Sequence, residues 1–97
     1  MATTNYPRTD ATVISHTLGT IANGVAILCD LPGISLSIRY TPTGLANDFP
    51  VSTVASGGLA FGEGSVASDV FKAGGVLTIT ASGFSEGGTA NVGVLEY

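Results

Sequence analysis

The chain has 97 residues, a formal net charge of −4 and only 10% charged residues. A chain of this length builds one hydrophobic core, and its excess of acids argues against nucleic acid as a partner, because nucleic-acid binding depends largely on neutralising phosphates. An average soluble domain is about one quarter charged, so this surface must carry many hydroxyl, amide and apolar groups. Such a surface suits a subunit that neighbours partly cover, and we expect a homo-oligomer.

Residues 1–10 are polar, show no alternation of apolar and polar positions, and contain Tyr6, Pro7 and Arg8. We expect a flexible arm there, outside a single domain that occupies residues 11–97. Tyrosine and arginine commonly anchor interfaces, so Tyr6, Pro7 and Arg8 are candidate interface residues. A merely disordered terminus is the alternative.

The sequence predicts neither a membrane-spanning segment nor a secretory signal. The longest uncharged stretch, 11–29, includes the polar residues Ser15, His16 and Asn23, which are costly in a hydrocarbon core. The first residues lack the basic-then-apolar order of a secretory signal. We therefore expect a protein that is made in the cytoplasm and does not cross a membrane.

Strands are predicted from period-two alternation, which is clearest at 34–40 and 76–82, where apolar residues alternate with serine, threonine and arginine. The run at 25–29 is apolar on both faces, as expected of a central strand. In chain order the predicted strands are 12–20, 25–29, 34–40, 49–55, 59–61, 65–71, 76–82 and 89–97.

The 14 glycines cluster in the short segments between these runs, where turns need them. No window has the i, i+3, i+4, i+7 spacing and the capping residues of a helix. Seven or eight short strands about ten residues apart predict an all-β fold, an antiparallel β-sandwich. We expect jelly-roll topology.

His16 is the sole histidine and Cys29 the sole cysteine of the chain. On a strand, His16 shares a face with Ile14 and Leu18, which favours a packed or interfacial histidine over a catalytic base. Cys29 ends an apolar run and is expected to be a buried, inert thiol. A Cys29 nucleophile with His16 as its base would require the two strands to pair in register. We predict no catalytic residues and no cofactor.

The carboxylates in and beside the predicted turns are expected to be solvated surface groups. They are Asp30, Asp48, Glu63, Asp69 and Glu86. A loop Ca²⁺ site is the alternative, but no Asp-x-Asp or Asp-x-Asn run concentrates ligands, and we predict no metal site.

The chain has no tryptophan and three tyrosines, which weakens the case for a sugar-stacking platform. Tyr97 either caps a sheet edge or lies in a subunit contact, and it is the fourth candidate interface residue.

The segment 70–80 has the sequence Val-Phe-Lys-Ala-Gly-Gly-Val-Leu-Thr-Ile-Thr. Together with the acidic charge, the polar arm and the Ser/Thr/Gly-rich strands, it resembles the small β-sandwich structural proteins of tailed-phage virions, especially head decoration or cement proteins. The resemblance implies a non-enzymatic virion protein, often a trimer or dimer, that binds across neighbouring subunits of the capsid lattice and stabilises the shell. Its contacts would be the arm and the sheet edges. The alternatives are a phage tail or receptor-binding β-module and a stand-alone carbohydrate- or ligand-binding sandwich.

Overall fold

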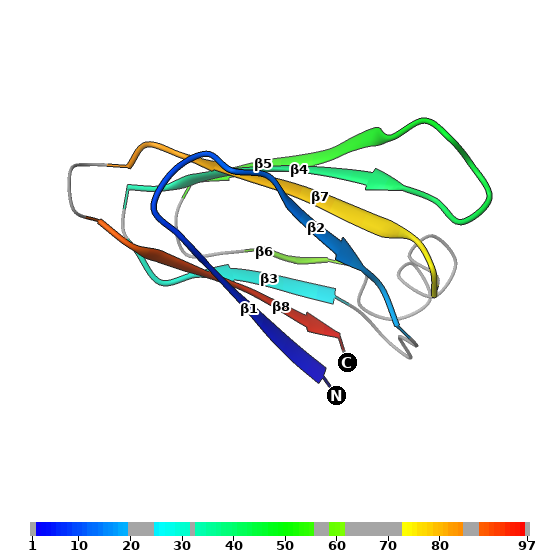
Figure 1. Ribbon diagram of the computed structural model, residues 1–97, viewed down its shortest axis with the longest axis horizontal. Coiled ribbons are helices and arrows are strands. Elements are labelled where there is room, and N and C mark those ends of the chain that lie inside the picture. Colours follow the sequence, from blue (N-terminus) through cyan, green and yellow to red (C-terminus); the bar gives the residue numbers. More distant parts are fainter. Residues whose placement is uncertain are drawn as a thin grey trace.

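The computed structural model describes residues 2–19, 25–31, 33–55, 59–61, 73–84 and 88–96. These residues form eight strands and no helix, arranged as two antiparallel four-stranded sheets that face one another (Figure 1). The predicted all-β class and two-sheet antiparallel architecture are confirmed.

The first sheet has the strand order β1-β8-β3-β6, and the second has the order β2-β7-β4-β5. The strands of the first sheet are β1 (Ala2–Arg8), β8 (Ala90–Glu96), β3 (Val25–Cys29) and β6 (Leu59–Phe61). Those of the second are β2 (Ile14–Thr17), β7 (Val76–Ser82), β4 (Ser35–Thr41) and β5 (Phe49–Ala55).

The strand pairs are nested along the chain. β4 pairs with β5, β3 with β6, β2 with β7, and β1 with β8, all antiparallel. These pairs alternate between the two sheets, and the further pairs β3–β8 and β4–β7 complete each sheet. The pairs are therefore nested in sequence order, from β4–β5 in the middle of the chain to β1–β8 near its ends.

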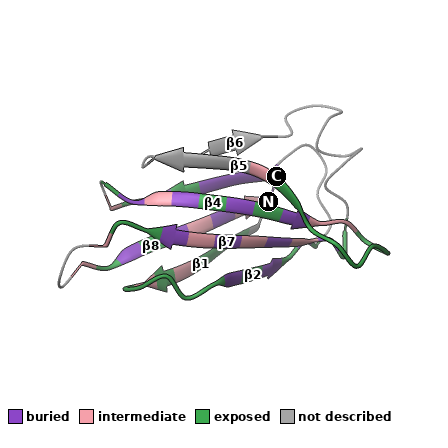
Figure 2. Cartoon of the chain, turned by 90° about the horizontal axis from the view of Figure 1, so that it is seen from above, coloured by how far each residue is buried: buried purple, intermediate pink, exposed green. Residues whose placement is uncertain are grey.

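The core lies between the sheets and is built from alternate residues of the strands. Along β4 and β7, buried positions alternate with exposed or half-buried ones (Figure 2). The large side chains that are almost fully buried are Ile14, Val25, Ile27, Ile34, Leu36, Ile38, Leu77, Ile79, Val92 and Val94. Burial of a side chain of this size contributes roughly 1.5–3 kcal/mol, so this aliphatic layer dominates the stability of the sandwich.

The sequence predicted most strand positions well. The predictions at 25–29, 49–55, 59–61 and 76–82 match the observed strands, while β4 begins one residue later than predicted and β2 is shorter than 12–20. The predicted strand at 65–71 lies outside the described residues.

The expectation of an arm outside the core is wrong for Ala2–Arg8. These residues form the edge strand β1, in continuous register with β8 from Ala2 opposite Glu96 to Arg8 opposite Ala90. The segment lacks alternation because an edge strand is held mainly by its backbone, and among its described side chains, those of residues 3–8, only Tyr6 packs on the core. The two ends of the described chain consequently lie side by side (Figure 1).

Candidate functional site

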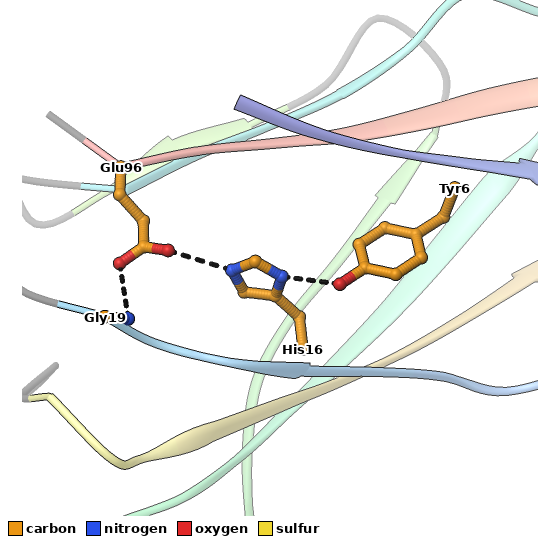
Figure 3. A network of polar contacts seen from close by, with 4 residues as sticks. All are labelled: Tyr6, His16, Gly19 and Glu96. Atoms are coloured by element: carbon orange, nitrogen blue, oxygen red, sulfur yellow. Dashed lines mark hydrogen bonds and ion pairs between the residues drawn. The ribbon is translucent and has the colours of Figure 1, made fainter. Parts of the chain in front are cut away.

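A polar network of three side chains joins the two sheets at the edge formed by β1 and β2 (Figure 3). The Tyr6 hydroxyl lies 2.7 Å from Nδ1 of His16, and Nε2 of His16 lies 3.0 Å from Oε2 of Glu96. The other carboxylate oxygen, Oε1, accepts a hydrogen bond of 2.8 Å from the backbone N–H of Gly19. We call Tyr6, His16 and Glu96 the clasp, because Tyr6 and Glu96 belong to the first sheet and His16 to the second.

Strand alternation places all three side chains between the sheets. His16 lies on β2 two residues after the buried Ile14, and Glu96 lies on β8 two residues after the buried Val94. Tyr6 lies on β1 opposite Val92 and packs against the core. Each polar group is thus on the apolar face of its strand, where it must find a polar partner or lose hydrogen bonds to water.

The geometry defines which nitrogen of His16 carries the proton in the neutral ring. A carboxylate only accepts, so Nε2 must be the donor to Glu96, and Nδ1 then accepts the hydrogen of the Tyr6 hydroxyl. Both ring nitrogens, both carboxylate oxygens and the hydroxyl are used in this arrangement. The buried anion of Glu96 accepts two hydrogen bonds, which offset the cost of removing it from water.

The environment of the clasp changes the acidity of its phenol. Burial raises the pKa of Tyr6 above 10.0, the nearby Arg8 charge opposes this shift, and the Glu96 charge adds to it. The Arg8 guanidinium carbon lies 6.0 Å from the centre of the Tyr6 ring, and the ring meets His16 edge-on at 5.7 Å between centroids. The phenol therefore remains protonated through neutral pH and acts as a hydrogen-bond donor.

The arrangement orders a carboxylate, an imidazole and a hydroxyl in one line, as nucleophilic triads do. The Tyr6 hydroxyl, however, already serves as a hydrogen-bond donor to His16. Among the described residues no pocket lies beside it in which a substrate could bind. Among the described residues no buried side-chain polar atom lacks a hydrogen-bond partner. What the geometry supports is a fully satisfied link between the sheets at their open edge.

The other candidate interface residues lie around the clasp or beyond the described chain. Pro7 is exposed on β1. The Arg8 side chain donates to the carbonyls of Pro7 and Thr12, at 2.9 and 3.1 Å, which turns it back over the β1–β2 connection. Tyr97 lies outside the described residues. A role for these residues in a subunit contact stays a prediction.

His16 and Cys29 are both buried, as predicted. Their strands do not pair, because β2 belongs to the second sheet and β3 to the first. The nitrogens of His16 are used by Tyr6 and Glu96, and the thiol of Cys29 has only a 3.9 Å contact with the Leu31 carbonyl. A Cys29 nucleophile with His16 as its base required these two strands to pair, and the structure does not meet this condition.

Two of the predicted surface carboxylates lie in the described chain, and both are exposed. Asp30 accepts two hydrogen bonds from Asn91, at 2.8 Å each from its backbone and its side-chain nitrogen. Asp48 accepts hydrogen bonds from Arg39 at 2.8 and 3.2 Å. Glu63, Asp69 and Glu86 lie outside the described residues, and the described ones include no group of three or more potential metal ligands.

Sequence reasoning missed the role of Glu96. Alternation along β8 places it on the same face as Val92 and Val94, and a carboxylate on an apolar strand face requires a partner. His16 has the same property on β2. The sequence thus contained one indication of the contact: His16 and Glu96 are both ionisable, and both lie on the apolar face of a strand.

Comparison with known proteins gives no match among protein-family models, curated proteins or solved structures. In the described part of the chain, no helix is long and apolar enough to cross a membrane.

Proposed function

We propose that this chain is a jelly roll that serves as a non-enzymatic structural subunit of a virion, decorating or cementing the capsid shell. The observation that carries the proposal is the nested pairing of the strands, from β4–β5 at the centre to β1–β8 at the ends. Nested antiparallel pairs of eight strands in two sheets support jelly-roll topology, which occurs in viral capsid domains as well as in lectin domains and cupins. Fold alone does not specify function, so the surface must supply the rest of the argument.

The surface chemistry favours assembly. Only 10% of the residues are charged, and the described chain exposes about half of each of four large apolar side chains: Val13, Leu28, Leu45 and Phe49. The described tyrosines, Tyr6 and Tyr40, pack inward and do not offer a platform for sugar rings. Apolar contacts spread over several neighbours suit a subunit that binds an assembled lattice in preference to an isolated capsid protein.

Heating shells with and without the protein tests this role. Binding to the assembled lattice raises its stability by RT ln(1 + [L]/Kd), which is on the order of 3 kcal/mol at a hundredfold excess over Kd. The shells are those of the capsid protein encoded in the same genome, and isolated capsid subunits serve as the control. We expect a higher disruption temperature and co-sedimentation with shells, and no binding to subunits. Unchanged disruption together with no co-sedimentation would remove the proposal.

A further inference from the structure

β1 is only lightly attached to the core of its own chain. None of its described side chains, those of residues 3–8, is buried, and only Tyr6 among them packs on the core. The strand lies at the edge of the first sheet and forms the outermost of the nested pairs. It can therefore leave β8 without breaking any other strand pair, and terminal segments of this kind open at a lower free-energy cost than the core.

The contacts that hold β1 would be the same for the β1 strand of a second copy. Backbone pairing with β8 runs over all 7 residues of the strand. The Asn5 side-chain amide donates to Oδ1 of Asn91 at 3.3 Å, and the Tyr6 hydroxyl donates to Nδ1 of His16 at 2.7 Å. β1 makes these contacts to β8 and β2, so an identical strand from another copy fulfils all of them.

The connection between β1 and β2, residues 9–13, contains no residue that requires a turn. All of these residues are exposed, and none is a glycine or a proline. Glycines with a positive φ lie instead in other connections of the chain: Gly33, Gly44, Gly74 and Gly83. Thr9, Thr12 and Val13 are β-branched, and β-branched residues favour an extended backbone. The connection is therefore suited to an extended conformation as well as to the observed turn.

Local hydrogen bonds hold this connection in its turn. The Asp10 carboxylate accepts from the backbone N–H and the hydroxyl of Thr12, at 2.9 and 2.5 Å, and Arg8 donates to the Thr12 carbonyl at 3.1 Å. In the described chain, the hydrogen bonds given for residues 9–13 join them only to one another and to Arg8. Because these groups are exposed, water can replace their partners on opening at a small net cost.

We propose that β1 is an exchangeable strand, which pairs with β8 of a second copy in the register that it has within its own chain. Residues 9–13 then extend as the hinge. Reciprocal exchange gives a closed two-fold dimer, in which Tyr6 of one copy donates to His16 of the other. The structure itself identifies the occupant of the β8 edge, because β1 already covers this edge and fits it.

The hinge and the clasp favour a second copy over another strand. The dimer keeps every β1 contact of two closed chains and brings two hinges together. Val13 lies in the hinge and is 52% exposed in the closed chain, so contact between hinges can cover it. An unrelated extended peptide would lack the Tyr6 hydroxyl and leave Nδ1 of His16 without its donor. The proposal goes beyond the proposed function and does not depend on it, since it concerns copies of this chain alone.

A disulfide that locks β1 onto its own chain tests the exchange. Asn5 and Gly93 are register partners, and a Cβ at Gly93 meets nothing within 4 Å. Paired residues of antiparallel strands lie about 4.5–5.5 Å apart at Cα, within the range of a disulfide. The variant Asn5→Cys, Gly93→Cys is oxidised as a dilute monomer. Every chain, the reference included, carries Cys29→Ala, which removes the native thiol.

Sedimentation equilibrium up to about 1 mM measures self-association of the reference chain and of the oxidised and reduced double variant. We expect the reference and the reduced variant to dimerise and the oxidised variant to stay monomeric. Dimers that form side by side, without exchange, would persist when β1 is locked. An oxidised variant that dimerises like the reduced one would therefore overturn the proposal, and so would a reference chain that is monomeric throughout.

Mixing single variants identifies the strands that meet. Asn5→Cys and Gly93→Cys chains are refolded together under reducing conditions and then oxidised, and peptide mapping locates the disulfide. We expect a covalent heterodimer linked between positions 5 and 93. Thr3→Cys mixed with Gly93→Cys is the matched control, because this pair is two positions out of register, about 7–8 Å apart, and should give far less product. Equal yields from the two mixtures would contradict exchange in the native register.

Discussion

His16 and Glu96 are 80 residues apart in the sequence and share a hydrogen bond of 3.0 Å between Nε2 and Oε2 in the interior of the sandwich. His16 is 5% exposed and Glu96 9% exposed. The bond connects the edge strand of the second sheet to a central strand of the first. Because it lies at the open edge of the sandwich, it limits separation of the sheets at the point where backbone pairing cannot.

Replacing Glu96 with alanine should lower the free energy of unfolding by about 1–3 kcal/mol. The substitution removes the acceptor for the buried Nε2–H of His16 and for the Gly19 N–H. Denaturant unfolding followed by circular dichroism measures the change. Unaltered stability of Glu96→Ala would contradict the clasp.

Glu96→Gln is the matched comparison and should lose less. The glutamine amide can donate to Nε2 if His16 changes tautomer, whereupon Nδ1–H donates to the Tyr6 oxygen. Asp10→Asn, at an exposed carboxylate, controls for the loss of one negative charge. A glutamine variant as unstable as the alanine variant would show that the charge of Glu96, and not its hydrogen bonding, matters.

Most strands were predictable because apolar side chains on one face of the strand alternate in the sequence with polar side chains on the other. β7 alternates apolar residues with hydroxyl residues, and β3, which lies between β8 and β6 in its sheet, is a continuous apolar run. β1 was not predictable in this way. β1 pairs with β8 through backbone groups, which every sequence has, so its side chains give no sign of the pairing. Its partner strand also lies far away in the sequence, at residues 90–96.

The clasp was predictable only in part. Alternation identified His16 as a packed residue, but period two does not say which strands face each other across the core. That information comes from the nested topology, which sets β1 and β8 opposite β2. The hydrogen bond from the Tyr6 hydroxyl to His16 in the same chain was not predicted, and the expected contact of Tyr6 with a neighbouring subunit stays a prediction.

Asp30 should contribute to stability against acid. Hydrogen bonds from the side chain and then the backbone of Asn91 hold the pKa of Asp30 below its ordinary value of 3.8. The folded state therefore binds fewer protons than the unfolded state in this range, and the contribution is present above about pH 4 and is lost as the pH falls through the lowered folded pKa.

The pH dependence of unfolding between about pH 5 and pH 2 tests this contribution. Asp10 and Asp48 also have lowered pKa values, through hydrogen bonds from Thr12 and Arg39 respectively. Asp30→Asn should consequently reduce the acid-dependent loss of stability without abolishing it. A wild-type slope in the variant would show that the bonds to Asn91 do not persist in solution.

Gly75→Ala should be strongly destabilising, in contrast to Gly93→Ala. A Cβ on Gly75 would overlap the hydroxyl of Tyr40 and approach two of its ring carbons to 2.6 and 2.7 Å. Tyr40 is 3% exposed and packed in the core, so the ring cannot move away without displacing its neighbours. We expect a loss of about 1–3 kcal/mol for Gly75→Ala and no loss for Gly93→Ala. Thermal unfolding of the two variants makes the comparison, and equal midpoints would contradict the packing around Tyr40.

Deleting residues 1–10 should destabilise the sandwich, because the deletion removes β1. The β8 edge would lose its backbone partner over the whole register from Ala2 to Arg8, and His16 would lose the Tyr6 hydroxyl. Tyr6→Phe separates the two effects: it keeps the strand and the ring and removes only one half-buried hydrogen bond, at a cost of about 0.5–1.5 kcal/mol. We expect the truncated chain to unfold at a clearly lower denaturant concentration than Tyr6→Phe and to aggregate more readily, since β8 becomes an unprotected edge.

Hydrogen exchange of the β8 amides provides an independent measure, with faster exchange in the truncated chain and near wild-type exchange in Tyr6→Phe. If the truncated chain retains wild-type stability and wild-type β8 protection, then β1 is not held in the sheet in solution and residues 1–10 behave as a free arm.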